Sequence, residues 1–156
     1  MDGSCIGTPQ RAGFGGIIGN PTWFFLWDFH GFITNSDDIL FDELSAIYHG
    51  LLMARDMDII DFVCYSNSLL CTNLINGRSS KFHICVTLIQ DIKDLLSQSN
   101  ISIIHTLREG NQCADYFAKL GVSSDSKLTI HLTAPLIWWT YLGVMLGEPS
   151  FLGASC

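Results

Sequence analysis

The alternation of apolar and polar stretches along this 156-residue chain predicts a mixed α/β domain. Short apolar runs between turn residues are typical of strands, and apolar positions recurring every three or four residues are typical of helices. Runs of the first kind lie at residues 13–18, 23–27, 61–65 and 101–106. A further strand at the start of the chain carries Asp2 and completes an antiparallel meander of three strands.

Helical spacing of the apolar residues predicts four helices. They lie at residues 41–54, 69–76, 83–97 and 111–120. The turn at residues 66–68 is expected to cap the second helix, and Gly121 to end the fourth. The resulting order, βββαβααβα, predicts one mixed five-stranded sheet. In it the meander joins parallel strands, and helices cover both faces.

The pattern weakens after Gly121, so we expect a domain over residues 1–122 and a tail over 123–156 that packs partly on it. Residues 136–139 of the tail are expected to form a short helix. The apolar run 134–146 has 13 residues, whereas a membrane helix needs roughly 20. No membrane partner is therefore expected.

The composition, 48% hydrophobic and 15% charged, excludes an intrinsically disordered chain. The six cysteines form no C-x-x-C pair, so cysteine-based zinc and redox motifs are not indicated. Because no secretory signal is recognisable, we expect reduced cysteines and an intracellular protein. The net charge of −7 argues against strong non-specific binding to nucleic acid. It permits an enzyme that holds nucleic acid through divalent metal ions.

Four polar side chains fall where predicted elements begin or end. Asp2 lies on the first strand, Glu43 in the first turn of the first helix, and Asn67 just after the fourth strand, while Asp115 begins the last helix. Ligands in such sheets gather near the ends of central strands, so these side chains are expected to converge. The alternative for Glu43 and Asp115 is that they only complement a helix dipole.

Several short motifs together resemble a known family. They are Asp2-Gly3-Ser4, Gly13-Phe14-Gly15-Gly16, Glu43-Leu44-Ser45-Ala46, Gly50-Leu51, Tyr65-Ser66-Asn67-Ser68 and the run from His105 to Gly121. The last is similar to the His-x-x-Arg-Glu-x-Asn-x-x-Ala-Asp-x-x-Ala run that closes the ribonuclease H-like domains of plant retroelement reverse transcriptases. In this order and at these spacings, the motifs make residues 1–122 similar to a type 1 ribonuclease H domain.

The resemblance implies metal-dependent cleavage of the RNA strand of an RNA–DNA hybrid. Two Mg²⁺ ions about 3.5–4 Å apart would activate a water and stabilise the leaving oxygen, with Mn²⁺ as an alternative. Asp2 would bridge both ions, Glu43 and Asn67 would complete the ligands of the first ion, and Asp115 would serve the second. His105, ten residues before Asp115, would assist product departure; the alternative is a half-buried histidine that ends a strand.

Two departures from the family bear on activity. Position 67 is Asn where the family has Asp, which removes a negative charge and is expected to weaken Mg²⁺ binding and cleavage. Only Met1 precedes Asp2, whereas the family's first strand begins several residues earlier, so a truncated first strand is expected. Two other functions remain open: a non-catalytic nucleic-acid-binding module, and an inactive remnant of a retroelement. The oligomeric state is not indicated by the sequence.

Overall fold

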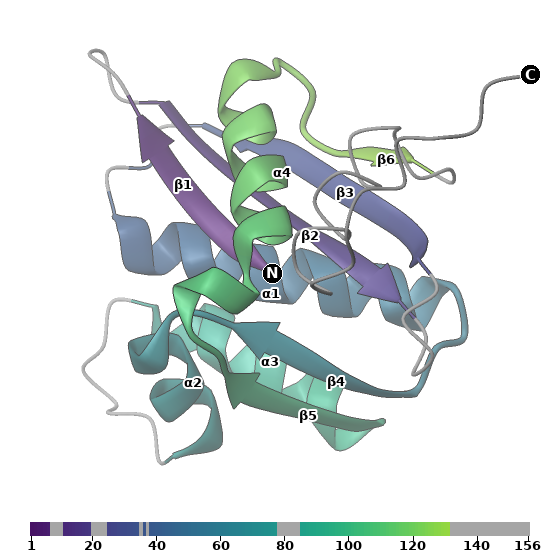
Figure 1. Ribbon diagram of the computed structural model, residues 1–156. Helices are drawn as coiled ribbons and strands as arrows, with labels where there is room; N and C mark the ends of the chain where they lie inside the picture. Colours follow the sequence, from purple (N-terminus) through teal and green to yellow (C-terminus); the bar gives the residue numbers. More distant parts are fainter. Residues whose placement is uncertain (7–10, 20–24, 35, 37, 78–84, 132–156) are drawn as a thin grey trace, which may run out of the picture.

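The computed structural model describes residues 1–6, 11–19, 25–34, 36, 38–77 and 85–131 (Figure 1). Within these residues, the elements follow one another in a mixed α/β order. They are β1 (Asp2–Ile6), β2 (Arg11–Gly19), β3 (Phe25–Ile33), α1 (Ile39–Asp56), β4 (Asp61–Ser66), α2 (Leu69–Asn76), α3 (Val86–Ser97), β5 (Asn100–His105), the 3₁₀ turn η1 (Arg108–Gly110), α4 (Gln112–Ser123) and β6 (Thr129–His131). The predicted combination of an antiparallel meander, a parallel strand pair and helices is confirmed.

The strands form two sheets rather than the single five-stranded sheet that was predicted. β1, β2, β3 and β6 pair antiparallel in that order, and β4 pairs parallel with β5. The two sheets meet where the Met1 amino group donates a hydrogen bond to the Tyr65 carbonyl oxygen, 2.9 Å away. Because β1 begins at Asp2, this contact is not continued into a ladder with β4 in the described residues.

Helices cover the meander on both faces (Figure 1). α4 crosses β1, β2 and β3 on one face, and α1 packs on β1 and β2 from the other face and also against α3. The largest fully buried apolar side chains fill the layers between them: Phe14, Phe29, Leu44, Ile47, Leu51, Ile89, Ile92 and Phe117. Each such side chain contributes roughly 1.5–3 kcal/mol through removal from water. The core therefore holds α1 and α4 firmly against the strand that carries Asp2.

The glycines of β2 allow α4 to approach the sheet closely. A Cβ atom added to Gly15 would lie 2.5 Å from the Ala118 backbone nitrogen, far inside van der Waals contact. The missing side chains thus place the backbone of α4, and with it Asp115, near β1.

Helix boundaries differ from the predictions in α1, α3 and α4. α1 begins at Ile39 because the Asp38 side chain accepts a hydrogen bond from the Leu40 N–H, so Glu43 lies beyond the first turn. α2 has the predicted bounds, and Ser68 caps it by accepting a hydrogen bond from Cys71 N–H at 3.3 Å. α3 begins only at Val86. The predicted features at residues 134–146, including the helix at 136–139, lie outside the described residues. Among the residues that the structure describes, no helix is both long and apolar enough to cross a bilayer.

Gly121 does not end α4, contrary to the prediction, since the helix continues to Ser123. The glycine is needed for close packing instead. A Cβ atom at this position would lie 2.4 Å from the Gly31 carbonyl oxygen and 2.9 Å from that of Phe14. Its neighbours are backbone atoms of β3 and β2, which cannot rotate away as a side chain can.

The Gly121→Ala variant is therefore expected to lower the free energy of unfolding. Overpacking costs about 1–3 kcal/mol, and alanine recovers up to about 1 kcal/mol through helix propensity, so a net loss of about 2 kcal/mol is expected at this backbone contact. Urea denaturation measures this loss. Ser123→Ala, an exposed change in the same helix, is the control. A Gly121→Ala protein as stable as the wild type would contradict the close packing of α4 on the sheet.

Candidate active site

The carboxylates of Asp2 and Glu43 come together where β1 begins. The Gly3 N–H donates hydrogen bonds to Asp2 Oδ1, at 3.1 Å, and to Glu43 Oε2, at 3.3 Å. Both acids are buried, with exposed fractions of 3% and 9%. A Cβ atom on Gly3 would lie 2.5 Å from the Glu43 backbone nitrogen. The Asp2-Gly3 pair thus lets α1 approach β1 closely enough for the two carboxylates to meet.

Burial makes both carboxylic acids weaker acids than usual. Burial raises the pKa of Asp2, and the hydrogen bond to Glu43 partly offsets that rise. Burial, followed by the charge of Asp2 and the hydrogen bond to it, raises the pKa of Glu43 to about 8. Glu43 therefore favours its protonated form near neutral pH, because the nearby Met1 amino group offsets only part of the rise in its pKa.

Asp115 joins this pair electrostatically from the first turn of α4. Its negative charge is among the causes that raise the pKa of Asp2. The Asp115 carboxylate lies 2.5 Å from Lys119 Nζ and 3.6 Å from Arg108 Nη2. Both cations are exposed, so water can replace either of them at Asp115 at little cost. Asp115, Arg108, Glu109 and Gln112 line a surface pocket at this end of α4.

Asn67 is held through Asn111, a residue to which the sequence analysis gave no role. Asn111 Nδ2 donates to Asn67 Oδ1 at 3.1 Å and to the Met1 carbonyl oxygen at 3.0 Å. The Asn111 carbonyl oxygen accepts from the Asp115 N–H. Asn111 is 95% buried and so fixes the three segments that carry Asp2, Asn67 and Asp115. In the sequence, this role could have been inferred from the position of Asn111 in the closing motif.

His105 lies at the same edge but apart from this network. It ends β5 opposite Ser66 of β4, and Asn67 follows Ser66 directly. The His105 side chain is half-buried, and within the described part of the chain its ring makes no hydrogen bond or ion pair. The structure therefore links Asp2, Glu43, Asn67 and Asp115, and does not bring the His105 ring into contact with them.

The four linked side chains offer three carboxylates and one amide oxygen. Hard oxygen ligands of this kind suit Mg²⁺ or Mn²⁺ and do not favour softer metals. The raised pKa values of Asp2 and Glu43 fit the same conclusion, because a bound cation would stabilise the ionised forms that burial disfavours. The donor set thus suits a divalent cation, while the ligand atoms of its three carboxylates do not all lie within 4.8 Å of one another in the described structure.

Comparison with protein families places this geometry in a known group. Residues 1–121 match the family described as "Reverse transcriptase-like". A comparison with curated proteins gave no match. The match covers all four linked site residues and most of the described elements.

Solved structures show the ribonuclease H-like fold. Ribonuclease H1 from Halobacterium salinarum NRC-1 has a TM-score of 0.72 and 21% identity, over 78% of this chain and 93% of that one. The N-terminal RNase H domain of Rv2228c from Mycobacterium tuberculosis has a TM-score of 0.70 and 22% identity, over 78% of this chain and 89% of that one. LC11-RNase H1, isolated from compost and solved with an RNA/DNA hybrid, has a TM-score of 0.69 and 20% identity, over 78% of this chain and 93% of that one in the hybrid complex.

Proposed function

Because the chain belongs to the reverse transcriptase-like family, we propose that it is a ribonuclease H-like domain that binds RNA–DNA hybrids and cleaves their RNA strand. The observation that carries this proposal is the buried Asp2–Glu43 pair. Two carboxylates from distant segments share one N–H donor at the start of β1, and burial beside Asp2 raises the pKa of Glu43 to about 8. Such a pair costs folding energy without a cation, so a metal-binding role explains why the chain holds it.

The proposed roles of the residues follow from their positions. Asp2 would contact both of two Mg²⁺ or Mn²⁺ ions, Glu43 and Asn67 one of them, and Asp115 the other. When bound, the metal ions activate a water and stabilise the leaving oxygen of the phosphodiester. Gly3 holds the first two carboxylates in place through its N–H.

Two further residues support the same site. Asn111 orients the Asn67 amide toward the Met1 end of β1. Arg108, with 75% of its side chain exposed beside Asp115, is positioned to bind a phosphate of the substrate. His105 is proposed to assist product departure from the same edge.

Activity is proposed to be impaired by Asn67. One amide oxygen remains as a ligand, but the charge of a carboxylate is missing from the site. This observation also favours a second candidate function, a non-catalytic module that binds nucleic acid at the same surface. We also propose that this domain is of the type 1, plant retroelement kind that the closing motif resembles.

A cleavage assay with a labelled RNA–DNA hybrid tests the proposal. Slow, Mg²⁺- or Mn²⁺-dependent cleavage of the RNA strand is expected, and Asp2→Asn should lower its rate by at least about 100-fold, the typical cost of losing one group that stabilises the transition state. Asp91→Asn, an exposed change on α3, is the control.

The remaining outcomes separate the competing functions. Cleavage that persists in Asp2→Asn would contradict the assigned site. Binding of the hybrid that weakens steeply with salt, without cleavage, would favour the non-catalytic module, since phosphate contacts release counterions. If the protein neither cleaves nor binds the hybrid, the inactive remnant is the interpretation that remains.

A further inference from the structure

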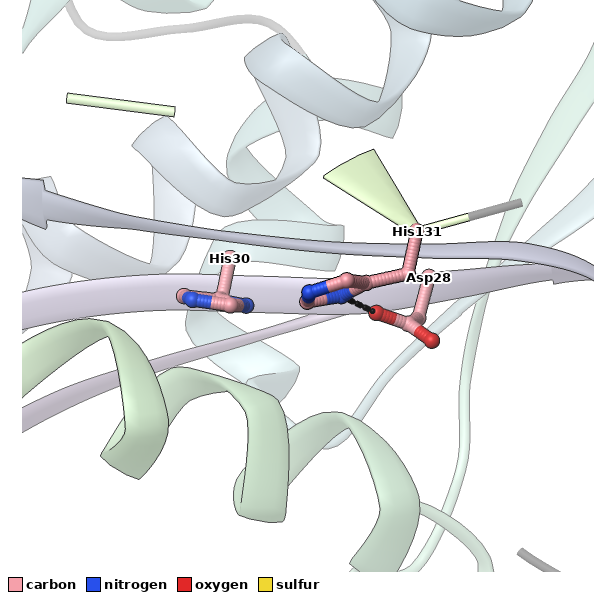
Figure 2. A group of neighbouring side chains, drawn as sticks. All are labelled: Asp28, His30 and His131. Carbon is pink, nitrogen blue, oxygen red and sulfur yellow. Dashed lines mark hydrogen bonds and ion pairs between the residues drawn. The ribbon is translucent and has the colours of Figure 1, made fainter. Parts of the chain in front are cut away.

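A second cluster of potential metal ligands lies on β3 and β6, on the side of the sheet away from β1. Asp28 and His30 are two residues apart on β3 and therefore project from the same face. His131 of β6 is the cross-strand partner of Asp28. Figure 2 shows the three side chains on one side of the sheet, near a helix. The proposed function uses none of them.

Two polar atoms in this cluster are buried without a partner. Asp28 is fully buried and His30 is 5% exposed. The Asp28 carboxylate receives a hydrogen bond from His131 Nδ1 on Oδ1 at 2.6 Å. Among the described residues, its other oxygen, Oδ2, and His30 Nδ1 have no hydrogen-bond partner. Buried polar atoms of this kind are rare because each costs about 1–3 kcal/mol, so they require an explanation.

We propose that Asp28, His30 and His131 form a site for Zn²⁺, which joins β6 to β3. One ligand atom from each residue lies within 4.8 Å of the others. Tetrahedral zinc bonds of about 2.0–2.2 Å place two ligand atoms of one ion roughly 3.5 Å apart, so the ligand atoms must close by up to about 1.3 Å. His131 can provide it, since its side chain is 41% exposed and it lies on a three-residue edge strand.

The chemistry of the cluster selects zinc rather than magnesium. Two imidazoles and one carboxylate suit Zn²⁺ and related transition metals, whereas Mg²⁺ prefers an all-oxygen set such as the one around Asp2. Three protein ligands leave one tetrahedral position for water on the exposed side of His131. Burial, and then the charge of His131, lower the pKa of His30, which keeps its ring in the neutral form that binds metal.

The cluster lies on the same sheet face as the candidate active site. Asp2 pairs with Gly15, and Gly15 pairs with His30, so the three residues form one row across β1, β2 and β3. Two strand spacings of about 4.8 Å put the backbones of Asp2 and His30 roughly 10 Å apart. The His30 ring also stacks near Phe117 of α4, with centroids 6.5 Å apart. A metal here would secure β6 beside the helix that carries Asp115.

A simple ion pair does not account for the whole cluster. The contact between His131 and Asp28 explains those two residues when His131 is protonated. It leaves His30 Nδ1 and Asp28 Oδ2 buried and unused. A cation between the three side chains would give the buried His30 ring a polar partner, which is why the structure favours a metal over the ion pair alone.

Zinc titration of the full chain by calorimetry, with the thiols kept reduced by a phosphine, tests the proposal. The wild type is expected to bind one Zn²⁺ that His131→Ala binds at least about tenfold more weakly, since even outer-shell partners of a metal contribute that much. Both proteins keep all six cysteines, so thiol binding cancels in the comparison. Thr129→Ala, a change on the same edge strand that keeps every imidazole, is the matched control.

Two further measurements keep the test independent of the proposed nuclease site. The ring nitrogen resonances of His30 and His131 should shift on zinc addition while those of His49 stay unchanged, and zinc should raise the Tm of the wild type but not of His131→Ala. Millimolar Mg²⁺ should not displace the ion. Absence of zinc binding in the wild type, equal binding by His131→Ala, or equal losses in His131→Ala and Thr129→Ala would each overturn the proposal.

Discussion

The Asn67→Asp variant is expected to cleave RNA–DNA hybrids at least about 100-fold faster than the wild type, the typical effect of one group that stabilises a transition state. The substitution returns a negative charge to a site whose other acids are Asp2, Glu43 and Asp115. Asn67 Oδ1 already accepts a hydrogen bond from Asn111 Nδ2 at 3.1 Å. A carboxylate oxygen can accept the same bond, so the new side chain is expected to keep the old orientation.

The same substitution is expected to destabilise the metal-free protein slightly. A fourth carboxylate adds repulsion to a cluster in which the charges of Asp2 and Asp115 already disfavour one another. Mg²⁺ should reverse this loss, because a ligand that binds only the folded state stabilises it by mass action. Thermal unfolding with and without Mg²⁺ measures both effects.

Asn73→Asp is the matched control for this experiment. It makes the same change of charge at an exposed position of α2. It should alter neither cleavage nor the dependence of Tm on Mg²⁺. An Asn67→Asp protein that gains neither activity nor stabilisation by Mg²⁺ would count against a surviving active site and favour the inactive remnant.

The Glu43→Gln variant is expected to be more stable than the wild type above pH 8 when no metal is present. The folded-state pKa of Glu43 is about 8, above its ordinary value of 4.5, because the group is buried beside Asp2. The stability that Glu43 contributes is therefore fully present below pH 4.5 and is lost as the pH rises through about 8. A glutamine keeps the donor of the protonated acid at every pH.

The size of this effect follows from linkage. Each unit of pKa shift corresponds to about 1.4 kcal/mol, so the variant is expected to exceed the wild type by at least about 1 kcal/mol at pH 8.5 and to match it near pH 5. Chemical denaturation across this pH range measures the difference. The stabilisation of the wild type by Mg²⁺ should be largest at alkaline pH and should be lost in Glu43→Gln.

Glu109→Gln, the same change at an exposed position of η1, is the control and should follow the wild-type pH profile. Parallel profiles for Glu43→Gln and the wild type would mean that Glu43 does not hold a proton in the folded state. The explanation of the Asp2–Glu43 pair as a metal site without its cation would then fail.

Local chemistry in the sequence was enough to locate most elements. The cap on α2 was readable because Ser68 contacts Cys71, three residues along the chain. The β2 glycines lie in a recognisable motif, and the structure supplies the partner that they pack against, Ala118 of α4. Helix ends depend less on local sequence alone: the Asp38 cap starts α1 at Ile39, and Gly121, a predicted helix end, instead serves the contact with Gly31. A glycine has the same local signature in both roles, so only the neighbouring strand distinguishes them.

By itself, the sequence determined the order of the main elements and which polar residues lie at their ends, because hydrophobic period, turns and caps act over a few residues. The tertiary structure alone decided how distant segments pair. It placed Asn111 between Met1 and Asn67, divided the strands into two sheets, and added β6 beside β3. His131 stands 103 residues from Asp28 and meets it only because these strands pair. Contacts over such separations depend on packing of the whole core, which leaves no local signature.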